Sequence, residues 1–131
     1  MKLNFRGVLA AALVSSLAFV GTGLAQPIKG TAEIGITQPT TKVVGKEVVT
    51  TMRVKNLSKQ SIAGFRVEEY WYDKAGNPAP GGSVRLNQPF APGEVKTIQM
   101  KTPRTPNMDR NSYQFTHANG TCTAKVMAKI Q

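Results

Sequence analysis

Alternating apolar and polar residues predict several short strands along the chain. Ala32, Ile34 and Ile36 alternate with threonine, glutamate and glycine over residues 31–37. Residues 47–56 repeat this alternation, with valine, threonine and methionine on one side and more polar residues on the other. A period of two residues is typical of a strand that buries one face. We therefore expect a half-buried strand over each of these ranges.

The most aromatic segment spans residues 62–73 and contains Tyr70, Trp71 and Tyr72. Its alternation changes phase at two adjacent glutamates near the middle. A bulge at that point would turn both apolar sets toward the core, whereas a regular strand would bury Trp71 and expose the two tyrosines. The sequence leaves both arrangements open.

Turn residues separate the remaining predicted strands, which we expect over residues 83–86, 95–102, 112–117 and 121–130. Gly76 supplies a positive φ for the turn after the aromatic segment, and Asn119-Gly120 is a strong hairpin signal. No 3.6-residue period is present, and proline or glycine interrupts every long window after Gln26. The sequence therefore predicts an all-β, immunoglobulin-like β-sandwich of about seven short antiparallel strands.

Residues 1–25 have the pattern of a cleaved signal peptide. Two basic residues precede an apolar run over residues 8–20, and small residues follow at Gly23 and Ala25. This three-part order is read by the secretion machinery, whereas the apolar run is short for an uncleaved membrane helix. We expect cleavage after Ala25, no transmembrane segment in the mature chain, and one domain over residues 26–131 in the periplasm or outside the cell.

Three segments at predicted strand ends carry characteristic turn residues. They are Asn56-Leu57-Ser58, Tyr72-Asp73-Lys74-Ala75-Gly76-Asn77 and Ala91-Pro92-Gly93-Glu94. Together they resemble the small FxLYD-type domains of exported bacterial proteins. Those domains are immunoglobulin-like sandwiches with no assigned catalytic activity or cofactor, and the resemblance implies the same here. Because the shared motifs are turns, the resemblance bears on fold rather than on function.

A second resemblance lies in residues 109–115, whose spacing is similar to the start of strand F in immunoglobulin domains. It implies that Tyr113 is a corner tyrosine whose hydroxyl bonds back to the chain, and that Trp71 lies on strand C. Phe115 stands where those domains have a cysteine. We therefore expect a methionine or valine from residues 47–56, in place of a disulfide, to fill the centre against Phe115.

Charge and cysteine content add two open alternatives. Removing Lys2 and Arg6 from the 17 basic residues leaves 15 against seven acidic ones, a net charge of +8. The basic residues are scattered, so we expect a solvated basic surface, with a dedicated polyanion site as the alternative. Cys122 is the only cysteine. We expect it to be a buried small apolar residue, and the alternative in an oxidising compartment is a Cys122-linked dimer.

Candidate catalytic and metal-binding residues are few. His117 is the only histidine, and with Cys122 it supplies two ligands, whereas a zinc site needs three or four. No serine-hydrolase or metalloprotease motif occurs. The adjacent Glu68 and Glu69 point to opposite faces of a regular strand, so they do not converge as paired acid and base. We expect no enzymatic activity, no cofactor and no metal site.

Two functions fit these patterns. The first is a non-catalytic interaction or structural module of the bacterial cell envelope that binds a protein partner through a sheet face or edge. Tyr70, Trp71 and Tyr72 are the candidate partner-binding residues, unless all three belong to the core, and residues 95–102 or the first strand offer an edge. The alternative is a polyanion-binding protein for acidic polysaccharide, lipid headgroups or nucleic acid. Acidic residues flank the aromatic cluster and would repel phosphates, which favours the protein partner.

Overall fold

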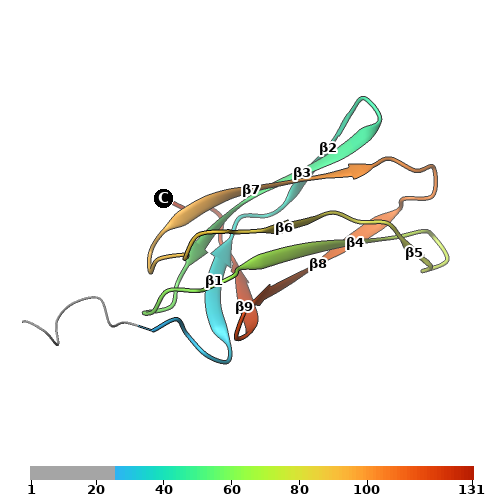
Figure 1. The fold of residues 1–131 in the computed structure, drawn as a ribbon. Helices are drawn as coiled ribbons and strands as arrows, with labels where there is room; N and C mark the ends of the chain where they lie inside the picture. The colour runs from blue at the N-terminus through green and yellow to red at the C-terminus, as the bar shows by residue number, and fades with distance from the viewer. Residues whose placement is uncertain (1–25) are drawn as a thin grey trace, which may run out of the picture.

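The computed structural model describes residues 26–131, and every regular element in this range is a strand (Figure 1). The predicted signal peptide lies outside the described residues. The strands are β1 (Ala32–Ile36), β2 (Thr40–Val44), β3 (Glu47–Asn56), β4 (Arg66–Tyr72), β5 (Pro78–Ala79), β6 (Ser83–Arg85), β7 (Val95–Pro103), β8 (Arg110–His117) and β9 (Gly120–Val126). Residues 26–131 therefore form an all-β domain, and they include no helix long and apolar enough to cross a membrane.

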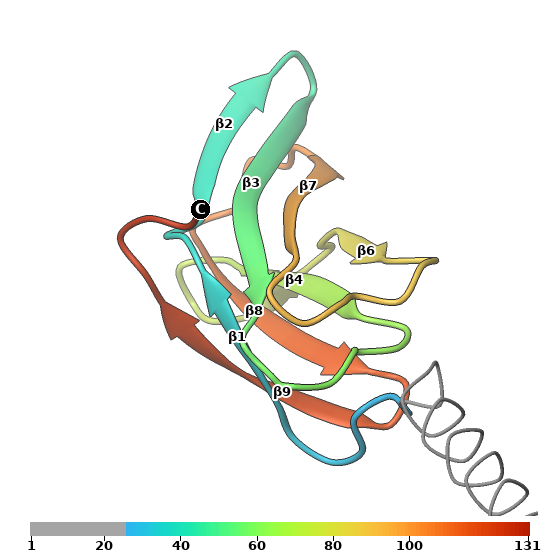
Figure 2. The same cartoon turned by 90° about the vertical axis from the view of Figure 1, so that its left-hand side faces the viewer.

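The strands form the two layers of an immunoglobulin-like sandwich. In one layer, β3 pairs along its whole length with β7 and on its other side with β2 and β1. In the other layer, β4 pairs with β8 on one side and with β5 and β6 on the other. β9 connects the layers because it pairs with both β1 and β8. The β2–β3 hairpin projects beyond the rest of the domain (Figures 1 and 2).

The seven predicted strands are present, but two further strands were missed and one pairing direction was wrong. β5 has two residues, and β2 is exposed on both faces, so neither has an apolar alternation to detect. β1 and β9 run parallel, with Ala32 opposite Cys122 and Ile36 opposite Val126. The first and last strands of the domain are thus neighbours, a relation that alternation within each strand does not encode. Because β1 lies between β3 and β9, it offers no free edge, contrary to the expectation. Residues 95–102, the other expected edge, belong to β7, which pairs with β3 alone and so lies at an edge of its sheet.

The apolar core lies between the two layers and is centred on aromatic side chains. The ring centroid of Phe65 lies 5.3 Å from that of Phe90 and 6.5 Å from that of Phe115. Met52 and Val54 are fully buried in the same cluster. Phe115 is partly buried and packs against this cluster, to which the opposite layer contributes Met52 and Val54, and no disulfide is needed to fill the space.

Asn56 joins two of the turn motifs at one end of the sandwich. Its side chain is 1% exposed, and its Nδ2 donates to the carbonyl oxygens of Gln60 and Phe90, both at 2.9 Å. Its Oδ1 accepts a hydrogen bond of 2.8 Å from the backbone N–H of Ser58. The backbone N–H of Asn56 also donates to the carbonyl oxygen of Glu94. These bonds satisfy the backbone of two loops, so the motif residues have a structural role.

The third motif is the turn between β4 and β5. The carboxylate of Asp73 accepts the backbone N–H of Asn77 at 2.8 Å, and this hydrogen bond lowers the pKa of Asp73. Gly76 takes the positive φ of +90° that the turn requires. All three motifs therefore stabilise turns.

Candidate functional site

β4 is a regular strand, so the second of the two predicted arrangements is the one observed. It pairs with β8 without interruption from Arg66 to Tyr72. Trp71 is 8% exposed and faces the interior, whereas Tyr70 is 38% exposed on the outer face and Tyr72 is half-buried there. Of the three candidate partner-binding residues, only the two tyrosines lie toward solvent.

The outer face of β4 is occupied by polar side chains that already contact one another. The hydroxyl of Tyr70 lies 3.0 Å from Oε1 of Gln114 and 3.3 Å from Oε2 of Glu68. Glu68 also forms an ion pair with Arg66 at 3.5 Å. Partial desolvation and the charge of Glu68 raise the pKa of Tyr70. A partner that binds here would have to replace these contacts.

Glu69 is buried in the interior while Glu68 faces outward, as the alternation predicts. Glu69 is 2% exposed, and its carboxylate accepts hydrogen bonds from the hydroxyls of Thr50 at 2.5 Å and Thr102 at 3.3 Å. Nδ2 of Asn111 donates a third hydrogen bond at 3.2 Å. Within residues 26–131, no basic side chain forms an ion pair with Glu69. Neutral donors from β3, β7 and β8 therefore hold this carboxylate.

Tyr113 belongs to the same buried polar cluster. Its hydroxyl accepts a hydrogen bond of 2.8 Å from Nδ2 of Asn111. Desolvation, together with the nearby charge of Glu69, raises the pKa of Tyr113 to about 12. The implied corner tyrosine is therefore wrong, because the hydroxyl contacts side chains of the interior and, among the described residues, forms no bond to an upstream backbone group.

His117 and Cys122 do not form a common site. Nδ1 of His117 accepts the N–H of Asn119 at 3.3 Å, so the ring hydrogen lies on Nε2, which donates to the carbonyl oxygen of Gly30 at 2.7 Å. Both ring nitrogens are thus used in holding loops. Cys122 is half-buried, and this burial raises the pKa of its thiol to about 11. No group of three potential metal-ligating side chains is found among residues 26–131.

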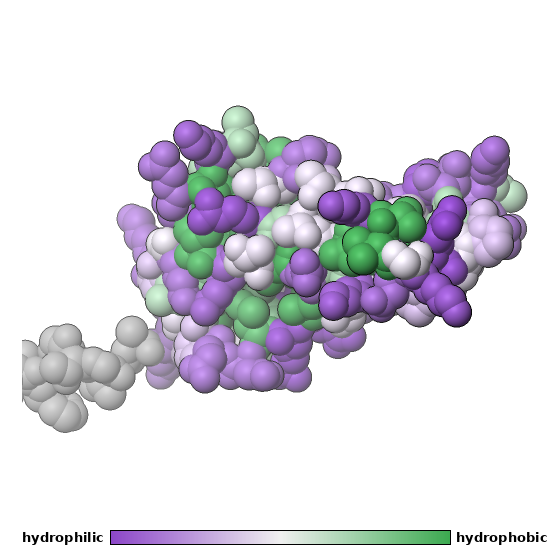
Figure 3. Space-filling view, turned by 90° about the horizontal axis from the view of Figure 1, so that it is seen from above, coloured by the Kyte–Doolittle hydropathy of each residue, from purple (hydrophilic) through white to green (hydrophobic). Residues whose placement is uncertain are grey.

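The β2 strand presents an open edge, which the sequence analysis missed. Its hairpin turn has Gly45 at the first central position with a φ of +61°, as in a type II′ turn. In such a turn the flanking residues, Val44 and Glu47, form a hydrogen-bonded pair. Hydrogen-bonded pairs alternate with non-hydrogen-bonded pairs along an antiparallel ladder, so Val43 and Thr41 direct their N–H and C=O groups away from β3. Val43 and Val44 are 53% and 52% exposed. In Figure 3, seen from the side on which the hairpin projects, an apolar patch is bordered by hydrophilic residues.

The outer face beside this edge is basic. Lys42 of β2, Val49 of β3 and Lys101 of β7 lie side by side across the three strands. Arg53 is exposed further along β3 on the same face, and its guanidinium donates to the carbonyl oxygen of Ile130 at 2.6 Å. Among the residues of β2, β3 and β7, Glu47 at the start of β3 is the one acidic residue on this face.

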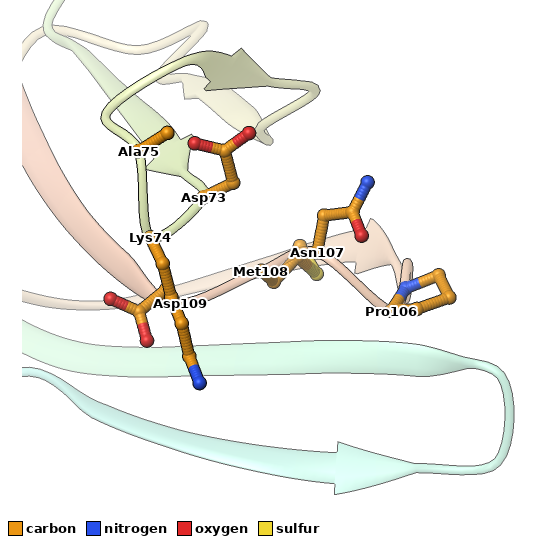
Figure 4. A pocket seen from close by; sticks show the side chains of 7 residues that line it. All are labelled: Asp73, Lys74, Ala75, Pro106, Asn107, Met108 and Asp109. Atoms are coloured by element: carbon orange, nitrogen blue, oxygen red, sulfur yellow. The ribbon is translucent and has the colours of Figure 1, made fainter.

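Two open grooves flank residues 104–109, the loop between β7 and β8. One has a volume of about 380 Å³ and is lined by Asp73, Lys74 and Ala75 from the turn after β4, together with residues 106–109 (Figure 4). Both carboxylate oxygens of Asp73 already bond to Asn77, so this carboxylate is used in holding the turn. The other groove, of about 340 Å³, lies between the same loop and the β2–β3 hairpin.

Comparison with known proteins identifies the fold and no function. The sequence matches no protein-family model and no curated protein. The structure is similar to that of IrmA from Escherichia coli, with a TM-score of 0.50 and 10% identity over 76% of this chain and 97% of IrmA. A DUF1425 family member from Shewanella sp. pv-4 aligns with a TM-score of 0.47 and 13% identity over 65% of this chain and 78% of its own. At such identities the likeness to IrmA concerns the fold alone, that of a small bacterial all-β domain.

Proposed function

We propose that the protein is an exported, non-catalytic interaction module of the bacterial cell envelope that binds an extended segment of a partner protein along the open edge of β2. The exposed β2 edge carries this proposal. Thr41 and Val43 direct unpaired backbone groups outward, and Val43 and Val44 are more than half exposed. Strand addition to such an edge gives affinity through main-chain hydrogen bonds and specificity through alternate side chains.

The basic face beside β2 determines the expected charge of the partner. Lys42 of β2 would be next to a segment added to the edge, and Arg53 and Lys101 lie on the same face, on β3 and β7. Among β2, β3 and β7, only Glu47 is acidic on that face. A second copy of this chain would bring a second set of the same cations to the interface. We therefore propose a partner segment that alternates acidic and apolar residues, because complementary charge favours such a partner over self-association.

Export and family membership are part of the same proposal. The basic start, the apolar run and the small residues of positions 1–25 support export to the periplasm or beyond. The turn chemistry of Asn56, Asp73 and Glu94 supports membership of the FxLYD-type class. The second candidate function is polyanion binding, which the same basic face supports and which differs in its dependence on salt.

The test is capture of a partner from envelope extract on immobilised protein, eluted first with high salt and then with denaturant. Residues 26–131 hold the described core and sheets, so this domain is used. Val43→Pro removes the outward N–H of the edge and leaves the β2–β3 hydrogen bonds in place, whereas Val43→Thr keeps that N–H. We expect the Val43→Thr variant to retain a discrete acidic protein through the salt step. The Val43→Pro variant should not retain this protein.

Two results would overturn the proposal. If all bound material elutes in salt as mixed acidic polymer, the basic surface itself is the activity. If both variants retain the same protein partner while their circular dichroism spectra remain native, the partner does not bind by strand addition to β2.

A further inference from the structure

The groove between the β2–β3 hairpin and the 104–109 loop has an apolar floor. Val48 and Trp71, which are 6% and 8% exposed, form this floor, and Thr41 and Val43 from the inner face of β2 form one wall. The loop forms the other wall. The volume of about 340 Å³ lies at the lower end of the range for ligand-binding pockets, roughly 300–1,000 Å³.

Two buried polar groups in this groove lack hydrogen-bond partners. Within residues 26–131, Nε1 of Trp71 and Oγ1 of Thr105 are the buried side-chain nitrogen and oxygen atoms without a partner, and both residues line this groove. Buried polar groups are almost always paired, so two unpaired groups in one place call for an explanation. The indole N–H is only a donor, and the threonine hydroxyl donates as readily as it accepts. The groove therefore favours a ligand with acceptor atoms.

The two unpaired groups favour a carboxylate as the acceptor. Arg104 and Asp109 are exposed charged side chains in the lining, whereas Lys42 directs its side chain to the opposite face of β2 from Thr41 and Val43. The charges of Arg104 and Asp109 balance, so the match depends on hydrogen bonding. A carboxylate has two acceptor oxygens for the two unpaired groups, and an apolar side chain next to it matches the floor.

The loop that covers the unpaired groups is held at its ends. The N–H of Arg104 donates to the carbonyl oxygen of Lys46 at 2.8 Å, and the N–H of Asp109 donates to that of Tyr72 at 2.9 Å. Between these anchors, the N–H of Met108 donates to the carbonyl oxygen of Thr105 over a long 3.4 Å. The N–H of Thr105 donates to Sδ of Met108 over the same distance, so the middle of the loop is held by two long hydrogen bonds within the loop itself. An outward movement of the middle would keep both anchors and would expose both groups to a ligand.

We propose that this groove binds the C-terminal residue of the partner segment. The apolar side chain of that residue packs on Val48 and Trp71, and its terminal carboxylate accepts hydrogen bonds from Nε1–H of Trp71 and the hydroxyl of Thr105. The inference rests on the proposed function, because Thr41 and Val43 form both the open edge of β2 and a wall of the groove. Capture of a terminal carboxylate next to an added strand combines two known modes of peptide recognition.

The sole tryptophan of the chain provides a direct readout of this contact. Trp71 gives a single indole N–H cross-peak in a ¹H–¹⁵N spectrum of the labelled protein. The probe is a hexapeptide of alternating glutamate and valine that ends in leucine, with either a free C-terminal carboxylate or a C-terminal amide. We expect the free acid to shift the indole peak to saturation and the amide to bind at least about tenfold more weakly, because a charge-assisted hydrogen bond is lost.

Matched variants test the groove residues separately. Arg104→Gln should weaken binding of the free acid roughly two- to fivefold, and Asp109→Asn should strengthen it by a similar factor. Thr105→Val should weaken the free acid and leave the amide unchanged. Lys59→Gln makes the same charge change as Arg104→Gln beyond the opposite end of β3, so it should have no effect.

The results separate this proposal from the proposed function. If the acid and the amide bind equally, or if the indole peak stays unmoved while the peptides bind, the groove does not capture a carboxylate. If, in that case, the Val43→Pro variant binds neither peptide, strand addition at β2 remains the proposed function. If neither peptide binds at all, the groove proposal fails for this ligand class, and the capture experiment alone decides the function of the edge.

Discussion

Replacing Asn56 by alanine tests whether the shared turn motif stabilises the fold. Asn56 is 1% exposed at the end of β3, and its side chain forms three hydrogen bonds of 2.8–2.9 Å to backbone groups of Ser58, Gln60 and Phe90. Alanine provides none of them. The carbonyl oxygen of Phe90 still accepts a hydrogen bond from the N–H of Ile62. The backbone N–H of Ser58 and the carbonyl oxygen of Gln60 lose the hydrogen bond to the Asn56 side chain.

The expected cost follows from the number of bonds. Each intramolecular hydrogen bond contributes about 1 kcal/mol net, so losing the three bonds of Asn56 lowers the free energy of unfolding by about 3 kcal/mol. For a domain of this size, a change of about 1 kcal/mol shifts the Tm by roughly 4–8 °C, so we expect a fall of about 12–24 °C. Ser58→Ala is the matched control, since its exposed hydroxyl bonds only to the backbone of Glu33. Its two hydrogen bonds lie at the surface, where water replaces them, so Ser58→Ala should cost about 1 kcal/mol or less.

Urea unfolding followed by the fluorescence of Trp71 measures both variants. We expect a lower midpoint for Asn56→Ala with an unchanged m value, because the surface exposed on unfolding stays the same. Asn56→Asp keeps the acceptor for Ser58 but places a charge against two carbonyl oxygens, so it should be at least as destabilising as alanine. A loss below about 1 kcal/mol for Asn56→Ala, or a milder effect of Asn56→Asp, would refute the reasoning.

Four further predictions concern buried side chains and one close backbone contact. Glu69→Gln should bring the pKa of Tyr113 down from about 12, because it removes the neighbouring charge, and an ultraviolet titration that still ends near 12 would contradict this. In the wild type, the folded state keeps the Tyr113 proton above the unfolded pKa of 10.0, so stability should fall as the pH rises from 10 toward 12, which urea midpoints across that range measure. Cys122, with a pKa of about 11 against 9.0, should react with a chromogenic disulfide reagent at pH 8 about 100-fold more slowly than the denatured chain, and equal rates would contradict the burial. Gly81→Ala would drive a Cβ into the backbone carbonyl of Glu69 and should cost at least about 2 kcal/mol in chemical unfolding, so a near-native midpoint would show that this approach is not tight.

The strands with one buried face were predictable from the sequence. In β3, every second residue from Val48 to Val54 is buried against the opposite layer, as the alternation predicts. Ile34 and Ile36 of β1 are buried in the same way. Such a strand has to repeat its apolar residues every second position, because successive side chains point to opposite faces. The local pattern therefore contains the information that the layer needs.

β2 and the β1–β9 pairing depend on information of another kind. β2 is exposed along its whole length, so no burial imposes an alternation on Thr40 to Val44. Its one local signal is Gly45-Lys46 between two runs rich in β-branched residues, which suits a two-residue hairpin. The parallel pairing of β1 with β9 joins the two ends of the domain, and nothing within either strand specifies its neighbour.

The phase of β4 shows why the candidate site could not be located from the sequence. A period of two places Glu69 on the same face as Trp71, so burying the tryptophan also buries a carboxylate, which is costly without compensation. The compensation comes from Thr50, Thr102 and Asn111, which belong to three other strands and are distant in sequence. Only the assembled sheets bring these donors together, and they make the regular strand stable. With Trp71 inside, the β2 edge combines two exposed valines with unpaired backbone groups, which is why the proposed partner site lies on the hairpin.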